Sequence, residues 1–541
     1  MGLPLEDTAQ QKQAAPGEEA SITRFAAIFA GGTMISRFAG LVRDIVFAHT
    51  IPAVPLGSFL FAFSLPNMLR DMLGEGAVNA ALVPVLSKAH ASSSEEEYRK
   101  AVSSLMTLML GFFLILTAAG ILVMPLAPAV LSSLRTFTGK ELPQSAEELQ
   151  ETVRLMQWTF PYLLFIGAAV FAMAPLFIAR RYSTPSWSPA LLNFTFIGCA
   201  FLFRNQFSNP AWALVIGVWI GGLIQFIVLW VDMFLHIGPV FPTFNLHYSA
   251  VSSALWLLFP VILGQAAGEV NKLVDRFFAL SLGEDTVLAL YISNRLVQFP
   301  LSIFGISVAV AILPALSKAY ALNRDKEQCT LMTSGIRQAF FLTAPATACL
   351  IVLRKPVIRL LFQRGEFGET GTEMAASALL YAAMGLVLFS LVKVMVQGFY
   401  ARHNTKIPVI IASFSMLLNI VLNALLVGPM GYQGLAFATT ISYAVNFSLL
   451  FFCYNFLVQK LLSPALMLSL IKISAASVLM SFCVWYAHNS LDSWLGITSM
   501  IQRLVTFTGA CATAALVYTF SCFFLRIDEF AALGRRLLRR K

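Results

Sequence analysis

The chain has 541 residues, of which 58% are hydrophobic and 12% are charged. Soluble domains carry about 25% charged residues, so this composition excludes a water-soluble globular protein and indicates a membrane protein. We attribute the net charge of +10 to lysines and arginines in cytoplasmic loops, and not to nucleic-acid binding.

The N-terminal segment 1–23 is polar and is expected to form a disordered cytoplasmic tail. The first apolar stretch begins near residue 24 and ends at His49. Because Arg37, Arg43 and Asp44 lie within it and no cleavage site follows, we interpret it as a retained membrane span rather than a signal peptide.

Thirteen further apolar stretches follow, so the fold class predicted is an all-α polytopic membrane protein with about fourteen transmembrane helices. Each stretch is long enough to cross a hydrocarbon core of about 30 Å, where only helices or closed barrels satisfy their own backbone groups. The stretches lie at about 57–86, 101–131, 155–178, 187–203, 211–235, 249–280, 286–316, 335–362, 371–400, 407–427, 433–459, 464–487 and 501–525.

An internal repeat predicts how these helices are organised. The motif Pro84-Val-Leu-Ser-Lys-Ala-His90 ends the second span, and Pro314-Ala-Leu-Ser-Lys-Ala-Tyr320 ends the eighth. Phe177-Ile-Ala-Arg180 and Phe399-Tyr-Ala-Arg402 end the fourth and tenth spans. Because each pair is six spans apart, the two copies have the same orientation in the membrane. We therefore expect two parallel six-helix lobes related by a pseudo-two-fold axis, at 24–248 and 249–460, then two extra helices at 461–525 and a basic cytoplasmic tail at 526–541.

The loops predict the orientation of the chain. Loops on the side shared by the two termini are rich in basic residues, which are typical of cytoplasmic loops. They hold Lys88, Arg99, Lys100, Arg180, Arg181, Lys318, Arg324, Lys326, Arg402, Lys406 and Lys460. Both termini are therefore expected in the cytoplasm.

Ionisable residues inside spans are unevenly distributed. Such a residue costs about 2.5–3.5 kcal/mol at the bilayer centre and usually faces a water-filled cavity. They gather in the first two spans of each half: Arg37, Arg43, Asp44, Arg70, Asp71, Glu75, Glu269, Lys272, Asp275, Arg276 and Arg295. If the halves face each other, these helices line one central cavity.

The arginines indicate what this cavity binds. Arg37 and Asp44 are seven residues apart and so share one stripe of the helix. The guanidinium groups of Arg37, Arg43, Arg70 and Arg295 suit phosphate or pyrophosphate, because each presents several donors in one plane. The alternative is that Arg43, Asp44, Glu75, Asp275 and Arg276 snorkel to the interface or pair with one another. The lone Lys393 is expected to snorkel.

Several motifs resemble those of the MurJ/MviN family of lipid II flippases, in the multidrug/oligosaccharidyl-lipid/polysaccharide exporter superfamily. They are Ser36-Arg-Phe-Ala-Gly-Leu-Val-Arg-Asp44, Leu65-Pro-Asn-Met-Leu-Arg70, Gly74-Glu-Gly-Ala77, Lys272-Leu-Val-Asp-Arg276, Asn294-Arg-Leu-Val-Gln-Phe-Pro300 and Gln363-Arg-Gly-Glu-Phe367. The resemblance covers about residues 24–530.

The resemblance implies a fourteen-helix transporter of the bacterial inner membrane that moves the undecaprenyl-pyrophosphate-linked peptidoglycan precursor to the outer leaflet by alternating access. It implies that the two extra helices form a groove for the polyprenyl tail. The family's cavity arginines correspond to Arg37, Arg43, Arg70 and Arg295, and the supporting or coupling candidates are Ser36, Asp44, Asn67, Glu75 and Asn294. Two positions depart from the family pattern, because Gly57 and Asn294 stand where many members have Asp.

Other functions remain open at this point. The chain could be another exporter of the superfamily, such as an O-antigen lipid flippase or a drug antiporter, although a cationic drug favours an acidic cavity. A membrane enzyme acting on polyprenyl phosphates would need a carboxylate pair or a nucleophile with its base, which we do not find. No metal or other cofactor is expected, and the identity of a possible coupling ion is left open. Lipid II and membrane lipids are the expected partners. A monomer is compatible with the sequence.

Overall fold

The computed structural model describes residues 16–72, 82–92, 94–129, 146–243, 249–458, 460–496 and 499–531, and these contain helices but no strand. Within them, eleven helical stretches are long and apolar enough to cross a membrane. The three other predicted spans correspond to α1, to α2 with α3, and to α10, which carry intramembrane charges. The prediction of an all-α polytopic membrane protein is confirmed.

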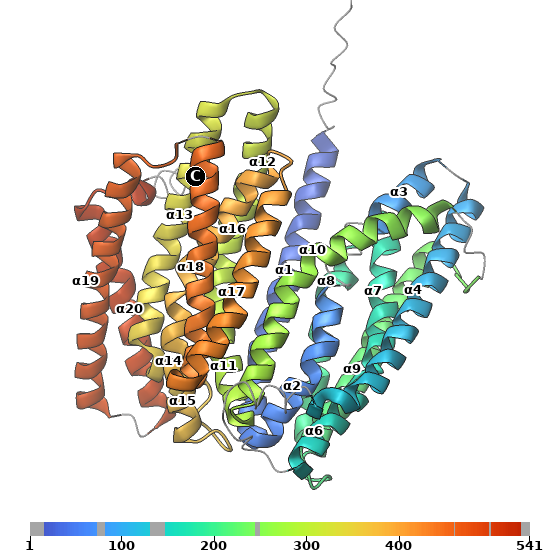
Figure 1. Ribbon diagram of the computed structural model, residues 1–541, viewed down its shortest axis with the longest axis horizontal. Helices are drawn as coiled ribbons and strands as arrows, with labels where there is room; N and C mark the ends of the chain where they lie inside the picture. Colours follow the sequence, from blue (N-terminus) through green and yellow to red (C-terminus); the bar gives the residue numbers. More distant parts are fainter. Residues whose placement is uncertain are drawn as a thin grey trace, which may run out of the picture.

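The first lobe lies on one side of the molecule (Figure 1). Within it α1 packs on α8, α7 packs on α4 and α9, and α2 packs on α6. Its helices are α1 (Pro16–Thr50), α2 (Ala53–Arg70), α3 (Val83–Ser92), α4 (Glu95–Val123), η2 (Met124–Leu126), α6 (Ala146–Thr159), α7 (Tyr162–Ile178), α8 (Ser183–Phe203) and α9 (Ala211–Ile237).

The second lobe lies beside the first, and α10 crosses from one to the other, contacting α3 and α4 as well as α17 (Figure 1). Its helices are α10 (Ser249–Leu280), α11 (Glu284–Pro300), η3 (Leu301–Ile306), α12 (Ser307–Ala321), α13 (Asp325–Val352), α14 (Arg354–Leu361), α15 (Glu369–Met384), α16 (Leu386–Tyr400), α17 (Lys406–Met430) and α18 (Tyr432–Leu457).

Two further helices, α19 (Pro464–Leu495) and α20 (Met500–Phe524), form a hairpin on the outer edge of the second lobe, where α19 packs on α13 (Figure 1). Their contact with the lobe includes two small apolar clusters, one around Phe341 and Ile473 and one around Leu353 and Met480. The hairpin is therefore attached to the second lobe through α13.

The internal repeat extends to an irregularity of the backbone. The second span becomes π-helical at residues 71–72, directly after α2, and the eighth becomes π-helical at Leu301–Ile306, directly after α11. These interruptions are 230 residues apart, like the motifs at Pro84 and Pro314 (301 − 71 and 314 − 84). Because π-helical turns are frequent at functional sites, both spans are candidates for the functional site.

Two features of the described structure concern the ends of the chain. Helix α1 begins at Pro16, so residues 16–23 are helical and not part of a tail; Pro at the first position and glutamates in the first turn favour a helix start. Residues 526–531 contact α13, because Arg337 pairs with Asp528 at 2.8 Å and with Glu529. The remaining tail residues, 1–15 and 532–541, lie outside the described part.

Candidate substrate-binding site

A buried polar network joins α1, α8 and α11. Arg43 donates from Nη1 to Asn193 Oδ1 at 3.0 Å and from Nη2 to the Tyr291 hydroxyl at 2.9 Å. Its Nε and Nη2 also donate to Asp44 Oδ1, at 2.9 and 2.6 Å. The Tyr291 hydroxyl in turn donates to the same oxygen at 3.0 Å. The Arg43 guanidinium is therefore held by protein groups on three helices.

Arg295 approaches this network from the second lobe. Its Nε lies 2.8 Å from Asp44 Oδ2, so a single carboxylate faces two guanidinium groups. Gly40 makes room for this arrangement, since a Cβ there would lie 2.3 Å from Arg295 Nη2. Asp44 is thus the anionic link between α1 and α11.

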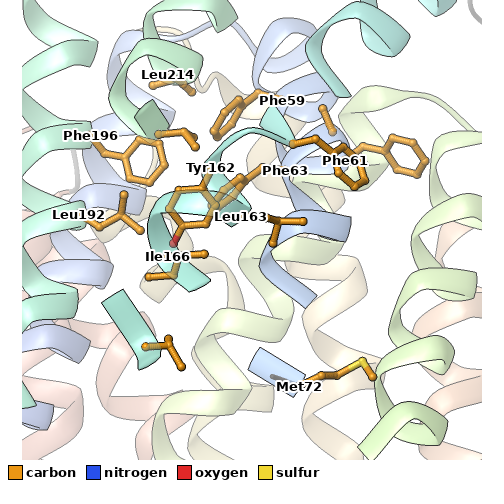
Figure 2. Packing of buried hydrophobic residues seen from close by; sticks show 14 of the residues in the cluster. Phe59, Phe61, Phe63, Met72, Tyr162, Leu163, Ile166, Leu192, Phe196 and Leu214 are labelled. Atoms are coloured by element: carbon orange, nitrogen blue, oxygen red, sulfur yellow. The ribbon is translucent and has the colours of Figure 1, made fainter. Parts of the chain in front are cut away.

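Aromatic rings support the network from one side. The Arg43 Cζ lies 5.5 Å from the ring centroids of both Phe47 and Phe196, within the range of cation–π contact. Phe196 packs edge-on against Phe59 and Phe63, and Figure 2 shows these three rings with Tyr162 in the core of the first lobe. This packing fixes Arg43 in place.

A second polar group lies where α2 gives way to the π-helical turn. Arg70 Nη2 donates to Asp71 Oδ1 at 2.6 Å, and Asn67 Nδ2 donates to Asp71 Oδ2 at 3.3 Å. Asn67 and Asp71 line a pocket of about 70 Å³ between α2 and α10, together with Ser64, Met68, Glu269, Lys272, Leu273 and Arg276. This pocket is part of the interface between the lobes and carries both signs of charge.

Lys393 of α16 belongs to the same region. Its side chain is exposed, although it lies within the apolar span Glu369–Tyr400, and its ammonium is within electrostatic range of Glu269 and Lys272. That Lys393 snorkels to the membrane surface stays a prediction.

The remaining predicted site residues have different surroundings. Arg37 is exposed and forms no ion pair or hydrogen bond within the described residues, and Asn294 is likewise exposed. The carbonyl of Ser36 accepts a hydrogen bond from Asn193 Nδ2 at 3.1 Å. Glu75 lies outside the described residues. The structure thus brings Arg43, Asp44 and Arg295 together, places Arg70 with Asn67, and leaves Arg37 accessible.

Sequence reasoning missed Asn193 and Tyr291, which complete the network around Arg43. Asn193 belongs to α8, a span without charged residues in its interior, and a neutral side chain gives little signal in an apolar helix. The donors of Arg43 are used by Asp44, Asn193 and Tyr291, as in the alternative that the charged residues pair with one another, and its role in substrate binding stays a prediction.

A separate polar cluster is buried inside the second lobe. Asn423 Nδ2 donates to Asp275 Oδ1 at 2.6 Å, and the amide nitrogen of Asn419 faces the same oxygen at 2.9 Å. Both asparagines are almost fully buried, and Asn423 Oδ1 has no hydrogen-bond partner in the described structure. Asp275 therefore neither snorkels nor forms an ion pair among the described residues, because the amides of α17 bind its carboxylate.

The lobes touch at the end of the molecule opposite the start of α1 (Figure 1). Ser58 Oγ donates to Glu284 Oε1 at 3.4 Å, and a Cβ on Gly57 would lie 2.2 Å from the Glu284 carbonyl oxygen. Nearby, the Glu366 amide donates to the His49 carbonyl at 3.4 Å. The absence of a side chain at position 57 thus allows α2 and α11 to meet backbone to backbone. Towards the other end the lobes are further apart.

These features can be compared with known proteins. The family model described as lipid II flippase MurJ matches residues 47–506. This chain belongs to the MurJ family.

Two MurJ proteins and one solved MurJ structure are similar to this chain over most of its length. The chain is 33% identical to the probable lipid II flippase MurJ of Vibrio cholerae, over 90% of this chain and 93% of that protein. It is 31% identical to the Haemophilus influenzae protein of the same name, over 93% and 100% of the two chains. A solved MurJ structure in an inward closed conformation superposes with a TM-score of 0.75 and 25% identity, over 92% of this chain and 99% of that one.

The fold also extends beyond the MurJ family. An inward-facing multidrug transporter of the MATE family superposes with a TM-score of 0.64 at 15% identity, covering 81% of this chain and 98% of that one. This likeness concerns the fold alone. The two-lobe arrangement is therefore shared with this transporter structure.

Proposed function

We propose that this protein moves lipid II from the cytoplasmic to the outer leaflet of the bacterial inner membrane. The observation that carries the proposal is the gathering of basic residues where α1 and α2 face α10 and α11, at a pocket that also holds Asp71 and Glu269. Arg37 is exposed on α1, Arg295 is partly exposed on α11, Lys272 and Arg276 line the pocket between α2 and α10, and the Lys393 ammonium lies within electrostatic range of Lys272. A pyrophosphate that enters a bilayer loses its hydration shell, and charged hydrogen-bond donors such as these replace the hydrogen bonds to water.

The arginines and Asp44 have different roles in this mechanism, either contacting the substrate or positioning another residue. Arg37 and Arg70 contact the pyrophosphate from the first lobe, and Arg295 contacts it from the second. Arg43 positions Asp44, and Asp44 in turn orients Arg295 through the 2.8 Å ion pair. The polyprenyl tail stays in lipid beside α19 and α20, whose outer faces are apolar, while the lobes move about the substrate. No covalent bond is broken, so the protein is a transporter and not an enzyme.

Both termini lie in the cytoplasm in this proposal, as the basic loops indicate. The end where Gly57 meets Glu284 then faces the periplasm, and the space between the lobes is reached from the cytoplasm. Lipid II is bound from the inner leaflet in this state. Release to the outer leaflet requires the Ser58–Glu284 contact and the Asp44–Arg295 pair to separate. One chain holds the whole site, so a monomer suffices.

A coupling ion, if one is used, has a candidate position at Asp275. The residues fit a monovalent cation, because one carboxylate is surrounded by neutral amides and Asn423 Oδ1 lacks a donor. Asp275, Asn419 and Asn423 would hold such an ion by their oxygens. The ion would supply a counter-charge for the partly buried Asp275 carboxylate, and it would link α10 to α17.

Replacement of the native flippase in a conditional bacterial strain tests the proposal. The protein is expected to restore growth and the appearance of precursor in the outer leaflet, and Arg37→Ala is expected to abolish both. Arg154→Ala is the matched control, since Arg154 is an exposed arginine of α6 outside the site. Failure of the unsubstituted protein to restore outer-leaflet precursor would contradict the proposal.

A further inference from the structure

A second polar pocket lies away from the space between the lobes, where α13 and α19 begin. It has a volume of about 700 Å³, within the range of about 300–1,000 Å³ that is usual for ligand sites. One wall is a face of α13, and the other is the segment that leads from α18 into α19. Lys326, Thr330, Thr333 and Ser334 contribute the first wall, and Lys460 and Ser463 contribute the second.

The pocket has a net positive charge. Lys326 and Lys460 form no ion pair within the described residues. Neighbouring carboxylates are engaged elsewhere, since Asp325 pairs with Arg402 at 3.4 Å and Glu327 pairs with Arg324 at 3.3 Å. Arg337 closes the inner side of the pocket and is itself compensated by Asp528 and Glu529. Two ammonium groups are thus left to face the pocket.

The second wall is held in a defined position. The Asn455 side chain accepts hydrogen bonds from the Leu461 and Leu462 amides, at 2.9 and 3.4 Å. Ser463 caps α19 by accepting from the Leu466 amide at 3.2 Å. The Cys329 thiol donates to the Lys460 carbonyl at 3.5 Å and so ties this wall to α13. The backbone at Lys460 is therefore held against α13, and Lys326 and Lys460 line the same pocket.

The rim of the pocket continues into lipid. Helix α19 is a membrane span that starts at Pro464, so the pocket lies at the level of lipid headgroups. Just beyond it, Leu462, Leu468 and Ile471 are apolar and more than half exposed. We propose that this pocket binds the phosphodiester headgroup of an anionic phospholipid, between Lys326 and Lys460, with its acyl chains along the apolar face of α19. A soluble phosphate would not use this apolar rim.

Native mass spectrometry of the full-length protein with phosphatidylglycerol tests this inference. The double variant Lys326→Gln/Lys460→Gln is expected to lose one tightly bound phosphatidylglycerol and to weaken its binding at least fivefold. Lys406→Gln, at another exposed lysine that starts a membrane helix, is expected to bind as the unsubstituted protein does. Thr333→Val keeps every charge and is expected to weaken binding as well.

Two results would overturn the inference. One is a double variant that is folded and binds phosphatidylglycerol as tightly as the unsubstituted protein. The other is inorganic phosphate that competes as well as phosphatidylglycerol, which would show that the pocket recognises the anion without its lipid chains. Phosphatidylcholine, whose headgroup carries no net charge, is expected to compete poorly.

Discussion

Asp44 of α1 and Arg295 of α11 form an ion pair that crosses from one lobe to the other, with Arg295 Nε 2.8 Å from Asp44 Oδ2. The other oxygen of the same carboxylate is occupied by Arg43, and the Asp44 side chain is 2% exposed. The buried Asp44 carboxylate thus pairs with both Arg43 and Arg295 and links the two lobes. Any motion that opens the molecule at this end must separate this pair.

Loss of the Asp44 charge is expected to destabilise the protein strongly. The Asp44→Asn substitution leaves two guanidinium groups close together without a counter-charge, and removal of one partner of a buried pair costs about 3–5 kcal/mol. Asp71→Asn is the matched control, because the Arg70–Asp71 pair is partly exposed and such pairs contribute about 0–1 kcal/mol. Thermal unfolding in detergent measures the difference. Equal midpoints for the two variants would contradict the role given to Asp44.

Arg37 and Arg43 are expected to respond differently to truncation. Arg37→Ala should leave the unfolding midpoint unchanged, because exposed Arg37 forms no hydrogen bond or ion pair within the described residues, but should abolish binding of a lipid-linked pyrophosphate. Arg43→Ala should lower the midpoint, because it removes hydrogen bonds to Asp44, Asn193 and Tyr291. Thermal unfolding and a substrate-binding assay on the same preparations distinguish the two. Unchanged substrate binding by Arg37→Ala would remove Arg37 from the site.

Gly57 is expected to control how closely the lobes meet. A Cβ at this position would overlap the Glu284 carbonyl, so Gly57→Ala should push α2 away from α11 and expose Ser58. The measurement is the reaction rate of a water-soluble thiol reagent with a Ser58→Cys variant that lacks the native cysteines. Gly57→Ala should raise this rate severalfold, whereas Gly198→Ala, where a Cβ meets nothing within 4 Å, should leave it unchanged. If the Ser58→Cys thiol reacts at the same rate with and without Gly57→Ala, the close approach of Gly57 to Glu284 does not hold the lobes together.

The Asp275 cluster is expected to respond to monovalent cations. If Asp275 and Asn423 hold an ion, adding sodium in place of a bulky organic cation should raise the unfolding midpoint, and Asp275→Asn should remove this dependence. Asp232→Asn is a suitable control, since Asp232 is also buried but pairs with Arg181 at 3.3 Å. A midpoint independent of sodium, with the Asp275→Asn variant folded, would exclude this cluster as the ion site.

Much of the fold could be predicted from the sequence because a bilayer leaves few choices. Apolar stretches such as 211–235 must be helices, and the two copies of the Pro-x-Leu-Ser-Lys motif showed that the halves are parallel repeats. The limits of the elements were less predictable. The polar start of α1 at Pro16 has no hydropathy signal, and the contact of residues 528 and 529 with Arg337 depends on tertiary packing.

The site was predicted in part for a similar reason. Charges inside spans are costly, so Arg37, Asp44 and Arg295 could be recognised without a structure. Their partners could not, because Asn193 and Tyr291 are neutral and come from distant positions in the chain. Which arginine is accessible and which is held by the protein also depends on how α1, α8 and α11 pack, and no local pattern encodes that.

The most direct test of the account is transport of lipid II by the purified protein in vesicles. Fluorescently labelled lipid II placed in one leaflet should appear in the other leaflet when the protein is present, faster than in protein-free vesicles. Arg37→Ala should reduce the rate to that of protein-free vesicles, whereas Arg154→Ala should transport normally. Transport at the unsubstituted rate by Arg37→Ala, or no transport by the unsubstituted protein, would contradict the account.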